Sequence, residues 1–261
     1  MKKPMTPRRE HELIINYMSF RKMLGFMGIG LPIVLIICSI VWNNGHIESS
    51  ISNYYYTRLR DVFVVTLCAM SLFLLTYKGS DETDRWITNL AGIFGLITAF
   101  IPTSFKHDIV LPNYQIVSKT PPYPGLTMEA LDKFELLKGT SPHKIIPGDS
   151  TDLMGMVHLV SAALFFLFLG YMSYFQFSKP KTTPRKLKQN LFKACGLIIF
   201  ITILALIPCS LNRFEPFYAK YKLIFIGETI CLFAFGLSWL IKGQLILKDR
   251  PINQLVDQSG N

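Results

Sequence analysis

LGFMGIGLPIVLIICSIVW, residues 24–42, contains no charged residue and is long enough to cross the apolar core of a bilayer. Five further apolar runs follow it, at 61–78, 86–105, 153–177, 191–211 and 221–241. Each run is close to the ~20 residues that a helix needs to span that core. Because backbone N–H and C=O groups find no partner in lipid, each run is expected to be an α-helix. The sequence therefore predicts an all-α, polytopic membrane protein with six transmembrane helices.

The composition argues against a water-soluble helical protein. Hydrophobic residues make up 50% of the 261 residues, and charged residues only 17%. A soluble helix needs a polar face along its whole length, whereas polar residues inside the six runs are sparse and isolated. The membrane prediction therefore depends on the number of runs as well as on their length.

Lys and Arg residues are concentrated in alternate connecting segments. Residues 1–22 and 178–190 are rich in both, whereas 43–60 holds only Arg58 and Arg60. Because cytoplasmic segments carry the excess of Lys and Arg, both chain ends are expected in the cytoplasm. The expected location is a cell membrane, plasma or bacterial inner, crossed several times.

The formal charge of +10 is expected to set this topology and to contact anionic headgroups. The aromatic residues lie in the runs rather than among the Lys/Arg clusters, so no nucleic-acid partner is predicted. The predicted partners are membrane lipids, with a homo-oligomer as an open alternative.

Three segments lie outside the six runs and are long enough to matter. Residues 1–22 are expected to be a basic cytoplasmic tail and 242–261 a second cytoplasmic tail, while 106–152 forms a long external loop between helices 3 and 4. Thr127 can cap a short helix near 127–138 within that loop. This helix is expected either to pack on the external helix ends or to lie over the mouth of the bundle.

Three ionisable residues lie where lipid does not tolerate them. Asp61 begins the second run, His158 follows about one turn into the fourth, and Glu228 about two turns into the sixth. All three helices enter from the external side, which places His158 ~6 Å and Glu228 ~10 Å below the outer edge. An ionisable group at such a depth normally faces the bundle interior and a partner. We therefore expect a polar pocket in the outer leaflet.

The pocket has several chemical interpretations. A carboxylate beside an imidazole can bind a divalent metal, relay protons or hold a polar headgroup, so Asp61, His158 and Glu228 are also the metal candidates. The candidate ligand-binding residues are Asp61, His158, Glu228, Arg58, Arg60, Tyr56 and Ser161, with His107 and Asp108 near the mouth.

A purely structural interpretation stands beside these. Asp61 can cap its helix, His158 can donate to a neighbouring carbonyl, and Glu228 can pair with Arg58 or Arg60.

Soluble-enzyme motifs are absent, among them the P-loop, GxSxG, HExxH and the dinucleotide fingerprint. No catalytic residue is assigned, and no cofactor is predicted apart from the optional metal. The preferred function is non-enzymatic binding or organisation of a lipid or small ligand. The alternative is a metal-dependent membrane hydrolase of lipid amides or esters using His158, Glu228 and Asp61. An ion or proton pathway comes third.

Short motifs at the external ends of the runs carry a family resemblance. They are Ile51-Ser52-Asn53, Asp61-Val62-Phe63, His158 with Ser161, and Glu228 with the aromatic and small residues of 233–236. In order and topology they resemble the DRAM-like (damage-regulated autophagy modulator) six-span proteins and related bacterial membrane families. Asn53 stands where that pattern has an acid. The resemblance implies a role in lipid organisation and membrane trafficking without an established catalytic activity.

The chain is also comparable with the alkaline ceramidase and adiponectin-receptor superfamily. Those proteins hold zinc with several histidines and an aspartate in seven helices, whereas here one histidine lies in a run. A zinc hydrolase with three histidines is therefore disfavoured.

Overall fold

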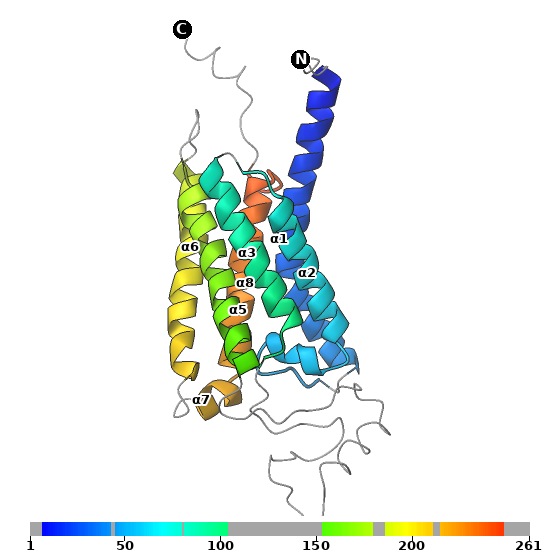
Figure 1. The fold of residues 1–261 in the computed structure, drawn as a ribbon, viewed down its shortest axis with the longest axis vertical. Coiled ribbons are helices and arrows are strands. Elements are labelled where there is room, and N and C mark those ends of the chain that lie inside the picture. The colour runs from blue at the N-terminus through cyan, green and yellow to red at the C-terminus, as the bar shows by residue number, and fades with distance from the viewer. Residues whose placement is uncertain are drawn as a thin grey trace, which may run out of the picture.

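The computed structural model describes residues 7–42, 45–79, 81–103, 153–179, 186–210 and 215–247, and these ranges contain helices and loops but no strand. The elements are α1 (Pro7–Trp42), η1 (Ser52–Tyr56), α2 (Arg60–Thr76), α3 (Glu82–Phe100), α5 (Leu153–Tyr171), η2 (Met172–Phe177), α6 (Lys186–Leu206), η3 (Ile207–Ser210), α7 (Glu215–Lys220) and α8 (Leu223–Lys242). The segments η1 and η3 are 3-10 helices, and η2 is a π-helix that continues α5. The long helices run side by side as one bundle (Figure 1).

Four helices are long and apolar enough to cross a membrane: Tyr17–Trp42, Leu153–Phe177, Lys186–Cys209 and Leu223–Lys242. The all-α prediction and the membrane prediction are confirmed at this level for the described residues. The helices α2 and α3 lie in the same bundle, but α2 has 17 residues and α3 begins with Glu82, Asp84 and Arg85. These two helices are therefore not among the four that meet the criteria of length and hydropathy for a membrane span.

Several helices begin before the apolar runs that predict them. The run 24–42 is the second part of α1, which begins at Pro7, so residues 7–22 of the predicted tail are helical. The run 191–211 is preceded by one more turn of α6, which begins at Lys186. An apolar run marks the part of a helix that suits lipid, whereas the helix itself continues into polar residues. The predicted helix 127–138 and the loop 106–152 lie outside the described residues.

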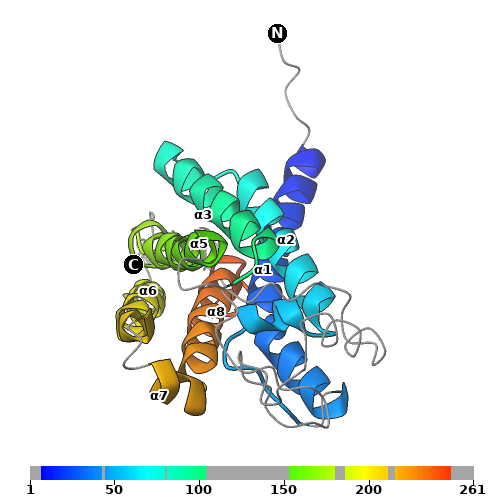
Figure 2. The ribbon, with the colours of Figure 1, turned by 60° about the horizontal axis from the view of Figure 1, so that its bottom comes forward.

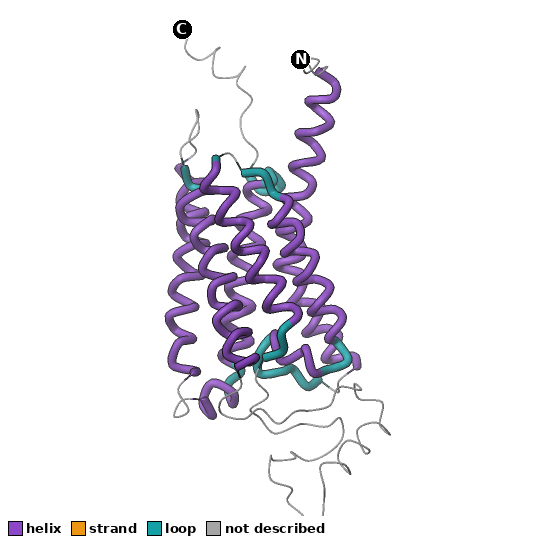
Figure 3. Tube along the Cα trace, viewed as in Figure 1, coloured by secondary structure: helices purple, strands orange, loops and turns teal. Residues whose placement is uncertain are grey.

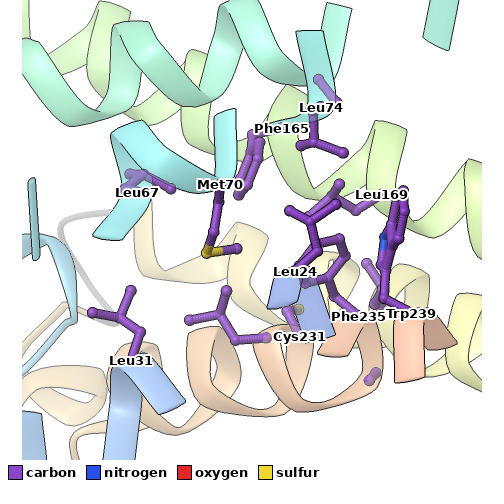
Figure 4. Close-up of a cluster of buried hydrophobic side chains, with 14 of the residues drawn as sticks. Leu24, Leu31, Leu67, Met70, Leu74, Phe165, Leu169, Cys231, Phe235 and Trp239 are labelled. Carbon is purple, nitrogen blue, oxygen red and sulfur yellow. The ribbon is translucent and has the colours of Figure 1, made fainter. Parts of the chain in front are cut away.

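The helix α8 occupies the centre of the bundle, between α1, α5 and α6 (Figure 2). Within its most apolar segment 61% of the residues are buried, against 22% for α6. Figure 4 shows side chains from four helices meeting around it. The buried set includes Leu24 and Leu31 of α1, Leu67, Met70 and Leu74 of α2, Phe165 and Leu169 of α5, and Cys231, Phe235 and Trp239 of α8. Because lipid is as apolar as these side chains, close packing rather than water exclusion must hold them together.

Glycines bring α1 and α8 together. A Cβ on Gly236 would lie 2.6 Å from the carbonyl oxygen of Gly25, and a Cβ on Gly25 would lie 2.6 Å from Cγ of Leu240. Real Cβ atoms do not approach other atoms this closely, so both positions require glycine at this crossing. Small residues are the usual means of such contact between membrane helices.

Loops join the helices at both ends of the bundle (Figure 3). We call one end the loop end; it holds residues 45–59, the end of α3 and the starts of α2, α5 and α8. The other is the aromatic end, defined by Tyr17, Tyr77, Phe177 and Trp239. Its rings stack or meet edge to face, with centroid distances of 5.6 Å for Tyr17–Tyr77, 5.0 Å for Tyr77–Trp239 and 5.2 Å for Phe177–Trp239.

Candidate functional site

Glu228 holds the loop segment that precedes η1. Its Oε2 accepts a hydrogen bond from the backbone N–H of Ile51 at 2.5 Å, and the Ser52 hydroxyl lies 3.4 Å from Oε1. Both loop residues are buried, so the carboxylate satisfies a backbone donor that water does not reach. The suggested pairing of Glu228 with Arg58 or Arg60 is wrong, because these backbone and hydroxyl donors occupy its two oxygens instead.

Hydroxyl groups of serine and tyrosine residues also hold this loop, and none of these residues was a predicted site residue. The Ser50 hydroxyl accepts from the N–H of Asn53 at 3.0 Å, and the Asn53 amide donates to the Ser49 hydroxyl at 2.8 Å. The Tyr54 and Ser39 hydroxyl oxygens lie 2.6 Å apart, which joins η1 to α1. Asn53 therefore organises the turn, even though an acid is expected there from the resemblance. The three serines within residues 49–52 are the sequence feature that could have indicated this hydrogen-bonded turn.

His158 lies in the second turn of α5 and has one bonded nitrogen. Its Nδ1 is 2.6 Å from the carbonyl oxygen of Ile101, at the end of α3. A carbonyl only accepts hydrogen bonds, so Nδ1 carries the hydrogen, and in the neutral ring Nε2 is an acceptor. The residue is 2% exposed, and its buried Nε2 has no hydrogen-bond partner in the part of the chain that the structure describes. The predicted bond to a neighbouring carbonyl is thus present, but it accounts for only one nitrogen.

Asp61 forms no hydrogen bond with either Glu228 or His158. It is exposed in the first turn of α2, where a negative charge suits the helix dipole. The N-cap residue of α2 is Leu59, so Asp61 is not itself the cap, but its first-turn position fits the expected interaction with the helix dipole. Within the described ranges, no group of three or more His, Cys, Asp or Glu side chains could hold a metal ion. A metal site built from Asp61, His158 and Glu228 is therefore not formed there.

The arginine and tyrosines of the expected rim bond to one another and to backbone groups. Arg60 donates to the Tyr55 hydroxyl at 2.9 Å and lies 4.4 Å from the centre of that ring. The Tyr56 hydroxyl donates to the Thr103 carbonyl at 2.5 Å. Arg58 is exposed. Tyrosine and arginine side chains of this kind suit the headgroup level of a membrane.

Ser161 is the remaining candidate and lies beside His158. It is three residues further along α5, so the two side chains share a helix face, and both are buried. Of the predicted residues, the structure places these two on one face. His107 and Asp108 lie outside the described residues.

The loop end contains a further ionisable residue, Glu48, which lies outside the apolar helices. Burial raises the pKa of the Glu48 carboxyl to about 7, although the charge of Lys222 acts in the opposite direction. Lys222 donates to the Ile47 carbonyl at 2.6 Å, and His46 Nε2 lies 3.8 Å from Glu48 Oε1. This part of the loop end was not predicted, because nothing in the sequence indicates that the Glu48 side chain is largely shielded from water.

No protein-family model, curated protein or solved structure matches this chain. Its function must therefore be argued from the loop end itself. There, the Ile51 N–H and the Ser52 hydroxyl donate to the Glu228 carboxylate, whereas no described residue donates to the buried Nε2 of His158.

Proposed function

We propose that this protein is a non-enzymatic membrane protein whose loop end binds a lipid or small polar ligand in the outer leaflet. The observation that supports it is the buried Nε2 of His158, which bonds to none of the described residues. A polar atom deprived of water and of a protein partner costs free energy, and such atoms are uncommon in folded proteins. A bound ligand that supplies a donor removes this cost.

The topology we propose has six crossings, with the aromatic end in the cytoplasm and the loop end outside. In support, α2 and α3 run alongside the four apolar helices (Figure 1). Lys22, Lys78, Lys179 and Lys242 all lie toward the aromatic end, in keeping with the positive charge of cytoplasmic segments. The membrane we propose is the plasma membrane or a bacterial inner membrane.

The competing proposal is a metal-dependent hydrolase of lipid amides or esters. It needs a carboxylate and an imidazole at one reacting centre. In the described residues the Glu228 carboxylate is bound to Ile51 and Ser52, and the bonded nitrogen of His158 is turned to Ile101. This arrangement favours binding over hydrolysis, and it suits the role in lipid organisation that the resemblance to DRAM-like proteins implies.

The experiment compares lipids before and after purification. The protein is purified in detergent, washed extensively, and examined by native mass spectrometry for retained lipid. We expect at least one lipid to remain per chain, and added lipid amides and esters to be recovered intact. Release of free fatty acid in proportion to the protein present would overturn the proposal, as would complete loss of lipid on washing.

A further inference from the structure

We infer that the ligand of this site presents an N–H or O–H hydrogen-bond donor to Nε2 of His158. The inference rests on the proposed function and names the chemical class of its ligand. Lipid headgroups with an ammonium group or with hydroxyl groups belong to this class. A choline headgroup, which has neither, does not.

The argument begins with the tautomer of the imidazole. The Ile101 carbonyl fixes the hydrogen on Nδ1, because it has no hydrogen of its own to donate over the 2.6 Å contact. The lone pair of the neutral ring is then at Nε2. The same contact fixes the orientation of the ring, so the acceptor has one direction in space.

The second step concerns burial. Nε2 is buried with no partner among the side chains and backbone groups of the described residues, and the residue as a whole is 2% exposed. An acceptor in such surroundings discriminates strongly, because a group that lacks a donor leaves it unsatisfied. A phosphate or carboxylate oxygen would bring a second lone pair toward the first and would be repelled. The site therefore selects for a donor, not simply for a polar group.

The third step is the neighbouring hydroxyl. Ser161 lies on the same face of α5 and is 3% exposed. A hydroxyl can donate as well as accept. It can therefore hold an acceptor oxygen beside the donor that His158 binds, and a headgroup that carries both kinds of atom satisfies both side chains.

The test uses phospholipid nanodiscs that contain equal amounts of phosphatidylethanolamine, phosphatidylglycerol and phosphatidylcholine. After extraction in detergent, native mass spectrometry counts each lipid retained by the protein. We expect the ethanolamine or the glycerol lipid to be enriched about tenfold over the choline lipid, the ratio given by one hydrogen bond to a buried acceptor. Enrichment of the ethanolamine lipid alone identifies an ammonium donor, and enrichment of the glycerol lipid alone identifies a hydroxyl donor.

The matched variants are His158→Asn and His158→Phe. The Asn amide can still donate to the Ile101 carbonyl but has no atom in the place of Nε2. Phe retains the ring and loses both contacts. We expect His158→Asn to keep the melting temperature nearly unchanged and to retain the three lipids equally, while His158→Phe loses both selectivity and stability.

Each outcome has one meaning. Lipid retained without preference by the native protein would overturn the inference and leave the proposed function standing. Loss of all lipid from the native protein would overturn both. Selectivity that persists in His158→Asn would also overturn the inference.

A second readout needs no variant. The nitrogen-15 chemical shift of Nε2 in the native protein should change when the ethanolamine or glycerol lipid is added and should stay constant with the choline lipid. An unchanged shift with all three would show that water or the protein satisfies Nε2, and the inference would fail.

Discussion

At the loop end, polar side chains bond to backbone groups of the segments between helices, whereas at the aromatic end side chains pack ring against ring. Glu228 binds the N–H of Ile51, and His158 binds the carbonyl of Ile101. At the opposite end, Trp239 contacts Tyr77 and Phe177. The first kind of contact depends on one atom pair and its protonation state, and the second on broad apolar surfaces.

Cations lie over aromatic rings at both ends. At the aromatic end, the Arg21 guanidinium lies 4.3 Å from the centre of the Tyr17 ring, and the Lys242 ammonium 4.5 Å from that of Phe177. At the loop end, the Arg60 guanidinium lies 4.4 Å from the centre of the Tyr55 ring, and Lys222 donates to the Ile47 carbonyl oxygen. The two ends therefore differ in their buried contacts rather than in their cations, and we expect the aromatic end to anchor the bundle.

The largest effect is expected from Trp239→Ala at the aromatic end. The ring is 1% exposed, so its removal leaves a cavity and should lower the free energy of unfolding by about 3–5 kcal/mol. Chemical unfolding in detergent micelles measures it. Trp86→Ala removes the same side chain where it is 65% exposed and should change little. Equal losses in both variants would contradict the assignment of the aromatic end as an anchor.

The next effect concerns the crossing of α1 and α8. A methyl group on Gly236 meets the Gly25 carbonyl, which cannot move without its helix. Gly236→Ala should therefore cost about 1–3 kcal/mol in the same assay. Gly30→Ala is the control, because a Cβ there meets nothing within 4 Å, and it should be neutral or slightly stabilising. If both variants behave alike, the close approach of the two helices is wrong.

The sequence predicts the positions of the membrane helices better than it predicts where those helices begin and end. Apolar runs of this length identify helices in lipid because an α-helix satisfies its backbone hydrogen bonds within a single segment. The position of each run follows from this rule, but the helix ends do not, as the extension of α1 to Pro7 shows. Polar flanking residues tolerate both helix and loop.

The candidate site could be predicted only in part. His158 and Glu228 are recognisable as candidates because ionisable residues are costly inside membrane helices. Their partners, however, are backbone groups: the carbonyl of Ile101 for His158 and the N–H of Ile51 for Glu228. Every residue carries such groups, so no side-chain pattern marks the partner. The structure shows no hydrogen bond among Asp61, His158 and Glu228, because depth in the membrane does not determine which face of a helix a residue occupies.

A comparable effect is expected at the loop end from Glu228→Ala. The variant leaves the buried N–H of Ile51 without an acceptor, which should cost about 1–3 kcal/mol. Glu228→Gln keeps one oxygen and should lose less. Thermal unfolding in nanodiscs measures both. Glu82→Ala removes an exposed carboxylate bonded to Arg85 and should behave like the native protein. If Glu228→Ala were equally silent, Glu228 would not hold the loop.

The last prediction is a pH dependence at Glu48. Its folded pKa of about 7 lies above the ordinary value of 4.5, so the folded protein keeps a proton that the unfolded chain has lost. Stability should therefore fall as the pH rises from 4.5 to about 7. Glu48→Gln should abolish this fall and be the more stable protein above pH 7.

The neighbours of Glu48 must be held constant in this measurement. Burial lowers the pKa of His46, which gives a rise in stability with pH over part of the same window. The comparison is therefore made in a His46→Gln background, with Lys222 unchanged. Melting curves that decline equally with and without Glu48 would assign the pH dependence to another group.

The bond between Ile51 and Glu228 joins positions that are 177 residues apart in the chain, and α1 packs on the same late helix through Gly25. A ribosome synthesises the earlier partner long before the later one. Until α8 has been synthesised, the glycine face of α1 and the N–H of Ile51 must therefore contact lipid or the insertion machinery instead. Truncation before α8 should leave an inserted but unassembled chain, which cellular quality control can recognise.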